Sequence, residues 1–277
     1  MPENNIYDLI ILTESIFMKK LFLLIIFSAL FLLTACTEEL ETKTDILEAA
    51  KTRGKFFVGV SSDCKPFCYI DNNNKFVGLE VDIAKRIAKK ILGSEDAVHF
   101  IDVRSSDLFS KINKNETDFS MAAITITPQR RMIVDFSDSY FTAGQAIIVK
   151  KNSSIKKIKD LNKKKIIVTL GSTGEQIPKK FAPAAILLGY KNNDLAYEAL
   201  LSGKGDALVS DDVFLKDFIT VHKDYKLLPY RLTVEQYGIA FKNTEEASAL
   251  KSEINNCLRE MRTDGTLKEL RKKWKTG

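Results

Sequence analysis

Residues 122–138 read AAITITPQRRMIVDFSD, a short apolar and hydroxyl-bearing segment followed by a proline and two arginines. Ile124 and Ile126 alternate with threonines, which is the period-two pattern of a half-buried strand. Pro128 suits the first turn of a helix, where its missing N–H group costs little. The pattern predicts a strand that ends at a short helix, with Arg130 just past the strand end.

Arg130 has a position and a chemistry suited to binding a carboxylate. Its guanidinium can donate two parallel hydrogen bonds to the two carboxylate oxygens, and the Thr125 hydroxyl with nearby backbone N–H groups can satisfy the remaining lone pairs. An isolated arginine, however, is more often a solvated surface cation, and threonine is common in strands for its conformational preference alone. The first interpretation predicts a small acid as ligand.

The rest of the chain alternates strand-like and helix-like patterns, which is typical of α/β proteins. The clearest helical pattern spans Glu80 to Ile91, with an apolar stripe on one face and Lys and Arg on the other. Similar patterns run from Leu250 to Met261 and from Leu267 to Trp274. Short apolar runs predict strands at residues 56–60, 147–149, 166–168 and 207–210. These patterns indicate an α/β fold with parallel sheets.

The N-terminal region resembles an export signal. Met18-Lys19-Lys20 precedes an apolar run over residues 21–33 and then Thr34-Ala35-Cys36. Residues 33–36 also resemble a bacterial lipobox, whose cysteine is acylated, so Cys36 is the predicted lipidation (palmitate) site and residues 37–44 the tether. An ordinary signal peptide with an incidental cysteine, or an uncleaved membrane helix, are the alternatives. Residues 1–36 are interpreted as an upstream extension and a lipoprotein signal peptide, and either Met1 or Met18 can be the start.

Composition agrees with a soluble domain, with 45% apolar and 28% charged residues. The formal net charge of +6 is mild for a chain of 277 residues. Basic clusters at residues 156–165 and 271–275 lack interleaved aromatic residues, so no nucleic-acid partner is indicated. These clusters are interpreted as solvated faces, with attraction to an anionic membrane surface as the alternative.

The cysteines do not indicate a metal site. Besides Cys36 the chain has Cys64, Cys68 and Cys257, an odd set without a paired Cys-x-x-Cys or a suitably spaced histidine. Cys64 and Cys68 could form a disulfide in an oxidising compartment, but the sequence does not establish the geometry that so short a loop requires. No metal and no cofactor are predicted.

Several motifs together resemble the family-3 extracellular solute-binding proteins, the polar amino-acid receptors of ABC importers. They follow one another in the order of the family and cover nearly all of the chain after about residue 45. Each is weak alone, but their co-occurrence in this order is improbable by chance. Besides residues 122–138, the motifs are residues 58–69 (VGVSSDCKPFCY), 78–84 (GLEVDIA), 160–174 (DLNKKKIIVTLGSTG), 203–211 (GKGDALVSD), 237–241 (YGIAF) and 264–274 (DGTLKELRKKW).

The resemblance implies a two-lobed, type II periplasmic-binding-protein-like α/β fold. Each lobe would be a mostly parallel sheet flanked by helices. Lobe 1 would comprise residues 45–142 and 237–277, and lobe 2 residues 145–234. Two hinge crossovers, near residues 143–145 and 233–236, would join the lobes, and a ligand between them would favour the closed form.

The resemblance also implies roles for individual residues in the cleft between the lobes. Cys64 and Ser105 stand where many relatives carry an aromatic residue over the ligand, so the pocket lacks that cover and looks neutral. Whether Phe67, Tyr69 or Tyr140 compensates is left open, and Asp211 read without the motifs could equally be a helix cap. The implied set is Arg130, Thr125, Thr173 and Gly174 for the ligand carboxylate, Asp211 and Ala123 for its ammonium, and Ser61, Cys64, Ser105 and Leu170 for its side chain.

The function implied by the resemblance is binding without chemistry. The protein would be a monomeric, lipid-anchored, extracytoplasmic receptor that captures an amino acid and delivers it to an ABC transporter permease. The anchor would lie in the cell membrane, or in an outer membrane facing the periplasm. Two alternatives are a cyclohexadienyl dehydratase-like enzyme on the same fold and a sensory or cell-wall module.

Overall fold

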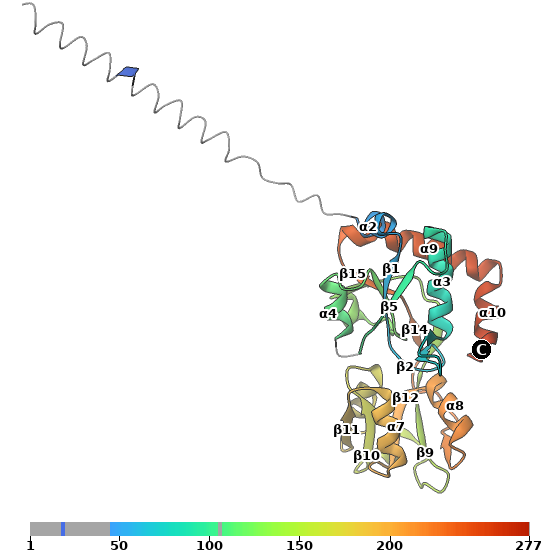
Figure 1. Cartoon of the computed structure of the whole chain (residues 1–277). Coiled ribbons are helices and arrows are strands. Elements are labelled where there is room, and N and C mark those ends of the chain that lie inside the picture. The colour runs from blue at the N-terminus through green and yellow to red at the C-terminus, as the bar shows by residue number, and fades with distance from the viewer. Residues whose placement is uncertain (1–17, 20–44, 105–106, 277) are drawn as a thin grey trace, which may run out of the picture. The chain divides into compact units, whose positions relative to one another are not determined.

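The computed structural model describes residues 18–19, 45–104 and 107–276 (Figure 1). Residues 44–277 form a unit of their own. The expected lipid-bearing Cys36 and the tether over residues 37–44 lie outside the described residues, as does the expected signal peptide apart from Met18 and Lys19.

Lobe 1 is built on a five-stranded mixed sheet of strand order β5-β1-β6-β15-β7. Strand β1 (Phe56–Val60) pairs in parallel with β5 (Val98–Asp102) and β6 (Phe119–Met121). Strand β15 (Ala240–Lys242) runs antiparallel to β6 and to β7 (Val134–Phe136). Because β15 comes from the C-terminal part of the chain, lobe 1 combines segments that are distant in sequence.

Lobe 2 is built on a second five-stranded mixed sheet, of order β11-β10-β12-β9-β13. Strand β10 (Lys165–Thr169) is parallel to β11 (Ile186–Tyr190) and β12 (Ala207–Asp211). Strand β9 (Gln145–Lys150) is antiparallel to β12 and β13 (Tyr225–Leu227). In each sheet four strands therefore run in one direction and one strand, β15 or β9, runs against them, so both sheets are mostly parallel as expected.

Two strands connect the lobes. The chain leaves lobe 1 through β8 (Phe141–Ala143) and returns through β14 (Glu235–Tyr237), and the two pair in antiparallel fashion (Figure 1). A small three-stranded sheet in lobe 1 follows β1. It contains β2 (Asp63–Cys64), β3 (Cys68–Ile70) and β4 (Phe76–Val77).

Helices cover both faces of each sheet. Lobe 1 has α2 (Ile46–Arg53), α3 (Leu79–Leu92), α4 (Leu108–Asn113), α5 (Pro128–Arg131), η3 (Glu245–Ala247), α9 (Ser248–Thr263) and α10 (Thr266–Lys273). Lobe 2 has η1 (Ile158–Leu161), η2 (Thr173–Glu175), α6 (Gln176–Phe181), α7 (Asn193–Leu201) and α8 (Asp212–Val221). Helices α2, α3, α9 and α10 contribute to one apolar cluster of lobe 1, and α4 to the other.

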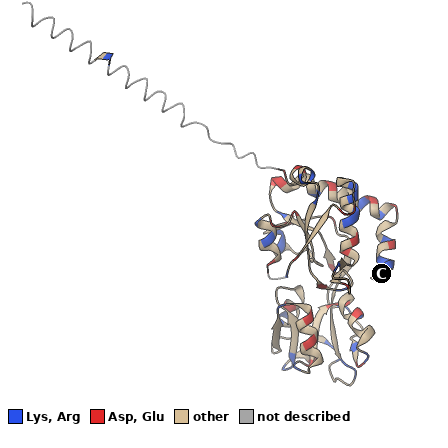
Figure 2. Ribbon diagram, viewed as in Figure 1, with Lys and Arg blue, Asp and Glu red and all other residues tan. Residues whose placement is uncertain are grey.

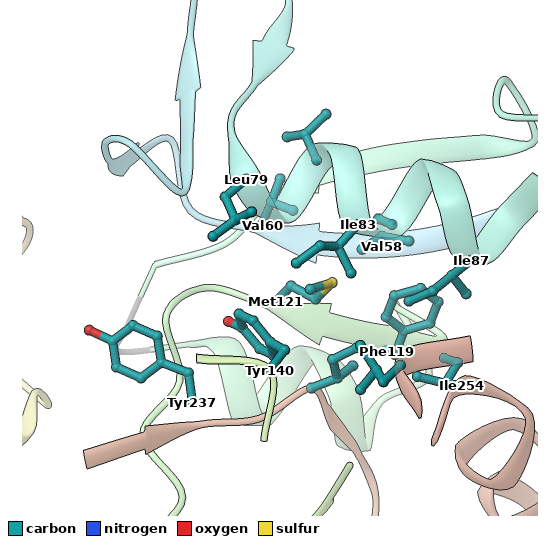
Figure 3. Packing of buried hydrophobic residues seen from close by; sticks show 14 of the residues in the cluster. Val58, Val60, Leu79, Ile83, Ile87, Phe119, Met121, Tyr140, Tyr237 and Ile254 are labelled. Atoms are coloured by element: carbon teal, nitrogen blue, oxygen red, sulfur yellow. The ribbon is translucent and has the colours of Figure 1, made fainter. Parts of the chain in front are cut away.

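The cores follow from the periodicity of the sequence. In β9, Ile147 and Val149 belong to one buried cluster and Ala146 and Ile148 to another, because successive side chains point to opposite faces of a strand. In α3, Leu79, Ile83 and Ile87 recur at helical spacing and pack with Val58 and Val60 of β1 (Figure 3). Each lobe thus has a buried core, and Val213 and Phe214 of α8 pack into the core of lobe 1.

Most of the predicted elements are confirmed, and one is wrong. The four strands predicted from apolar runs lie within β1, β9, β10 and β12, and the three helical patterns correspond to α3, α9 and α10. The strand expected around Ile124 is instead a loop with one isolated bridge, from Thr125 to Tyr237. Ala123 adopts φ 49°, a left-handed bend that ends β6 at Met121. Pro128 begins α5 as expected.

Within the described part of the chain, no helix is long and apolar enough to cross a membrane. The same residues contain no group of three or more His, Cys, Asp or Glu side chains that could hold a metal ion. The three cysteines among them, Cys64, Cys68 and Cys257, are buried and free, so the possible Cys64–Cys68 disulfide is not formed.

Candidate functional site

A small cavity of about 50 Å³ lies between the two lobes. Lobe 1 lines it with Cys64, Leu108, Phe109, Ala122, Ala123, Ile124, Thr125 and Arg130. Lobe 2 lines it with Thr169, Ser172, Thr173, Asn193, Ser210, Asp211 and Phe214. The cavity therefore brings together six of the residues proposed from the sequence, which are Ala123, Thr125, Arg130, Cys64, Thr173 and Asp211.

Arg130 reaches the cavity from the short helix α5. The Thr127 side chain caps this helix by accepting a hydrogen bond from the Arg130 backbone N–H at 3.1 Å. The guanidinium donates to the Thr125 carbonyl at 2.9 Å and, across the cleft, to the Gly171 carbonyl at 3.1 Å. Burial lowers the pKa of Arg130, whereas the charges of Asp211 and other nearby groups raise it. Because a guanidinium has five donors, others remain for a ligand.

Asp211 faces the same cavity from lobe 2, at the end of β12. It occupies the N-cap position of α8 but its side chain makes no capping hydrogen bond. It is 8% exposed, and its Oδ1 has no hydrogen-bond partner among the described residues. Burial, and then the charge of Glu235, raise its pKa to about 7, although Tyr237 and Gln145 nearby oppose the rise. A buried acceptor without a donor suits a cationic group of a ligand.

The bend at Ala123 is held by Glu80, a residue that the sequence placed only in the first turn of a helix. Glu80 lies in the first turn of α3 and is fully buried. Its Oε1 accepts hydrogen bonds from the Ala123 backbone N–H at 2.7 Å and from the Tyr140 hydroxyl. Burial raises the pKa of Glu80 to about 7. Glu80 therefore positions the loop that carries Ala123 and Thr125 into the cavity.

Replacing Glu80 with glutamine should flatten the pH dependence of stability. A carboxyl whose folded pKa lies above its ordinary 4.5 favours folding below about pH 4.5, and this contribution is lost as the pH rises through about 7. The difference in unfolding free energy between Glu80→Gln and the parent should therefore move in favour of the variant by on the order of 3 kcal/mol over that range. Urea unfolding at several pH values measures it, and parallel curves for the two proteins would contradict the assignment.

Glu235, beside the cavity, is one residue that the sequence analysis did not propose. It lies at the start of β14, in the return connection, and is buried. Its Oε2 accepts from the Thr125 hydroxyl of lobe 1 at 2.8 Å and from the Thr173 hydroxyl of lobe 2 at 2.6 Å. Oε2 also accepts from the Gln145 amide at 3.3 Å, and Oε1 from the Thr233 hydroxyl at 2.8 Å. The two threonines proposed as carboxylate ligands thus donate their hydroxyl protons to a protein carboxylate that joins the lobes.

Replacing Glu235 with alanine should destabilise the protein by about 2–4 kcal/mol, because four donors lose their shared acceptor in a buried site. Chemical denaturation compares the variant with the parent. Glu235→Gln, which keeps one acceptor oxygen, should lose less. Equal stability of the alanine variant and the parent would show that water replaces the carboxylate at no cost.

The remaining proposed residues lie beside the cavity or outside it. Gly174 is buried, and a Cβ atom there would lie 2.6 Å from Gln145 Oε1, so its small size serves packing. Ser61 hydrogen-bonds Asp63, and Leu170 is 41% exposed. Neither lines the cavity. Ser105 lies outside the described residues.

None of the three aromatic residues considered as replacements for the missing cover lines the cavity. Phe67 and Tyr140 are fully buried in the core of lobe 1, and Tyr69 lies elsewhere on the same lobe. Instead, Phe109 and Phe214 line the cavity, one from each lobe. The Phe109 ring lies 5.6 Å from the Arg130 guanidinium carbon.

Asp63 and Asn193 form a second bridge across the cleft. The Asn193 backbone N–H, at the start of α7, donates to the Asp63 carboxylate at 2.6 Å, and its side-chain amide donates to the Asp63 carbonyl at 3.2 Å. The Asn193 amide oxygen accepts from the Thr169 hydroxyl at 2.8 Å. Together with the bond from Arg130 to Gly171, this bridge closes the cleft around the cavity. Asn193 carries no sequence signal beyond its place before a helical pattern.

Comparisons with known proteins agree with this arrangement. The family model of the bacterial extracellular solute-binding proteins, family 3, matches residues 56–277. The ABC transporter glutamine-binding protein GlnH of Bacillus subtilis (strain 168) is 40% identical over 93% of this chain and 97% of its own length. A solute receptor for L-cysteine of Neisseria gonorrhoeae has the same fold, with a TM-score of 0.79, 30% identity, and coverage of 82% of this chain and 92% of that chain.

A third relative bears on the enzyme alternative. The ancestral amino acid-binding protein AncCDT-1, a precursor of cyclohexadienyl dehydratase, matches with a TM-score of 0.77 and 35% identity, covering 82% of this chain and 98% of its own. Two of these three relatives are named as binding proteins and the other as a solute receptor. The two-lobed α/β fold expected from the motifs is confirmed by these structures. The chain belongs to the bacterial extracellular solute-binding proteins, family 3.

Proposed function

We propose that this protein is an extracytoplasmic receptor that binds a neutral amino acid between its lobes, with the carboxylate on Arg130 and the ammonium on Asp211. The observation that supports this most strongly is that one half-buried cation and one buried anion, from different lobes, face a single cavity. Among the described residues, no other charged side chain lines the cavity. The carboxylate and ammonium of an amino acid would pair with Arg130 and Asp211. The described lining of the cavity then has no charged group left to pair with a charged ligand side chain.

The walls around these two charges favour a polar but uncharged ligand side chain. Hydroxyls and an amide come from Thr169, Ser210 and Asn193, and apolar surface comes from Phe109 and Phe214. Glutamine is the first candidate, because a relative that is 40% identical is named for it, and L-cysteine is the second. In this proposal the Ala123 carbonyl accepts from the ligand ammonium. The Thr125 and Thr173 hydroxyls, which donate to Glu235 in this structure, would have to reorient to donate to the ligand carboxylate.

Binding should require the lobes to separate. A cavity of about 50 Å³ holds roughly three to five water molecules, which is less space than a glutamine needs. Separation would break the hydrogen bonds from Arg130 to Gly171 and from Asn193 to Asp63, while the connections near residues 143–145 and 233–236 act as the hinge. The proposed lobes are residues 45–142 with 237–277, and residues 145–234.

We further propose that the receptor acts as a monomer, is anchored through lipid on Cys36, and delivers its ligand to an ABC transporter permease. The family description as extracellular proteins and the naming of a relative as part of an ABC transporter support the location and the partner. Mass spectrometry of the protein purified from membranes tests the anchor, and a Cys36→Ala variant released into the soluble fraction is the expected result.

A panel of amino acids in a thermal-shift assay tests the proposed ligand class. A ligand that binds only the folded state at 100 times its Kd stabilises by about 2.7 kcal/mol and should raise Tm by roughly 5 °C or more. Glutamine, cysteine or another neutral polar amino acid should give this shift, whereas lysine, arginine and glutamate should not. Prephenate should not be converted to an aromatic product. A response limited to charged amino acids would overturn the proposal.

A further inference from the structure

A second, larger cavity lies outside the amino-acid site. It is a groove of about 670 Å³ whose walls come from the β2–β3 hairpin and the end of α10 on lobe 1, and from α8 and the return connection on lobe 2. Its basic side chains are Lys65, Lys216, Arg231, Arg271, Lys273 and Lys275, and its only acidic ones among the described residues are Asp212 and Asp217.

The acidic residues do not neutralise the groove. Asp212 pairs with both Lys216 and Arg231, at 2.9 Å and 2.7 Å. Asp217 lies 3.7 Å from Lys65. Each acid is thus already engaged, and one of them is shared between two cations, so the groove cannot offer a free carboxylate to a cationic ligand.

The end of α10 adds cations of which two have no acidic partner. Lys273 pairs with Asp82 at 2.6 Å, whereas Arg271 and Lys275 make no ion pair with any described residue. The same two residues also line a neighbouring hollow with Arg262, Lys268 and Lys272. Figure 2 shows Lys and Arg along this end of α10. The helix dipole favours basic residues in the last turn of α10. It does not explain why Lys65, Lys216 and Arg231 line the groove from other elements.

Arg271 is the most informative of these cations. Its side chain is half-buried, one of its terminal nitrogens donates to the Tyr140 carbonyl, and its Nε has no partner among the described residues. The guanidinium carbon lies 5.3 Å from the centre of the Phe141 ring. Removing a cation from water without a counterion is unfavourable, so an anion bound beside Arg271 would recover part of that cost.

We propose that this groove binds a multiply charged oxyanion of the phosphate class. Several cations from four parts of the chain match several negative charges, and arginine with lysine is the usual combination for phosphate. A volume of about 670 Å³ exceeds what one phosphate fills, so we infer a ligand with two or more linked phosphates or phosphate groups presented side by side. Free diphosphates and the headgroups of anionic phospholipids both have this chemistry.

Trp274 provides the measurement, because it is the only tryptophan of the chain and lines the groove. Its indole N–H donates to Asp82 at 2.7 Å, and its ring packs edge to face with Tyr69. Titrating the full chain with pyrophosphate should change the tryptophan fluorescence in a saturable way, and inorganic phosphate should bind more weakly. High salt should weaken both.

Variants separate a specific site from general attraction between charges. Arg271→Gln and Lys275→Gln should each weaken pyrophosphate binding at least tenfold. Lys275 is exposed, so its replacement should not disturb the fold. Lys204→Gln changes the net charge equally at an exposed turn outside the groove and should leave it unchanged. Arg271→Lys should bind with intermediate affinity. Equal losses for Lys275→Gln and Lys204→Gln, or no saturable signal together with no vesicle binding, would overturn the proposal.

Sedimentation with vesicles distinguishes the source of the phosphate. The ligand is a headgroup if phosphatidylglycerol vesicles bind the parent but not Lys275→Gln, phosphatidylcholine vesicles bind neither, and pyrophosphate gives no signal. If pyrophosphate binds and vesicles do not, the ligand is soluble. If neither binds, the groove is not an oxyanion site. Glutamine binding by Lys275→Gln should equal that of the parent, so this test and that of the receptor function fail separately.

Discussion

Replacing Arg130 with alanine should weaken amino-acid binding by two to four orders of magnitude, or about 3–5 kcal/mol. The guanidinium is the cation of the cavity, and its two hydrogen bonds to backbone carbonyls leave donors for a carboxylate. In the variant, the ligand carboxylate would be enclosed without a counterion. Isothermal titration calorimetry with glutamine, or with whichever amino acid the panel selects, gives the change in Kd.

Arg131→Ala is a matched control for this prediction. Arg131 is the next residue of α5, is exposed, and lies over the Phe136 ring rather than the cavity. The control should bind within about twofold of the parent, because surface substitutions usually change energies by less than about 0.5 kcal/mol. If both variants bind equally well, Arg130 does not hold the ligand.

Replacing Asp211 with alanine should also weaken binding by at least two orders of magnitude, because the ligand ammonium would lose its buried counterion. The parent should in addition bind more weakly at low pH. The pKa of Asp211 is raised to about 7, so below that pH the carboxyl is protonated and must lose a proton before it can pair with the ammonium. The apparent Kd should rise roughly tenfold for each pH unit below the pKa and be constant above it.

Two further variants test this pH dependence. Asp211→Asn should bind weakly at every pH between 5 and 8. Glu235→Gln should shift the onset of weakening to lower pH, because the charge of Glu235 is one cause of the raised pKa of Asp211. Asp212→Asn is the matched control, since Asp212 is also buried but pairs with Lys216 and Arg231 outside the cavity. A Kd of the parent that is independent of pH would contradict the role of Asp211.

The elements that the sequence predicted are those with a simple periodicity. The stripe of Ile83 and Ile87 in α3 and the apolar run of β10 each repeat one pattern along a single element. The segment around Thr125 misleads, because alternating Ile and Thr is equally satisfied by an extended loop when Ala123 bends the chain and Glu80 takes its N–H. Such a bend depends on a residue more than forty positions away, which local patterns do not contain.

The candidate site was predictable in its charged centre and less so at its edges. Read alone, Arg130 could be a surface cation and Asp211 a helix cap, and it was the order of the family motifs around them that favoured the ligand roles. Glu235 carries only the signal of an acidic residue in a strand-like connection, and its role depends on threonines from both lobes. Phe109 and Phe214 look like ordinary core residues in sequence, and only the closure of the lobes brings them to the cavity.

The most direct test is a crystal structure of the protein with its preferred neutral amino acid bound. We predict the ligand carboxylate within hydrogen-bonding distance of the Arg130 guanidinium and the ammonium within the same distance of the Asp211 carboxylate. A ligand in the cleft whose carboxylate contacts neither Arg130 nor lobe 1, or whose ammonium points away from Asp211, would contradict the account.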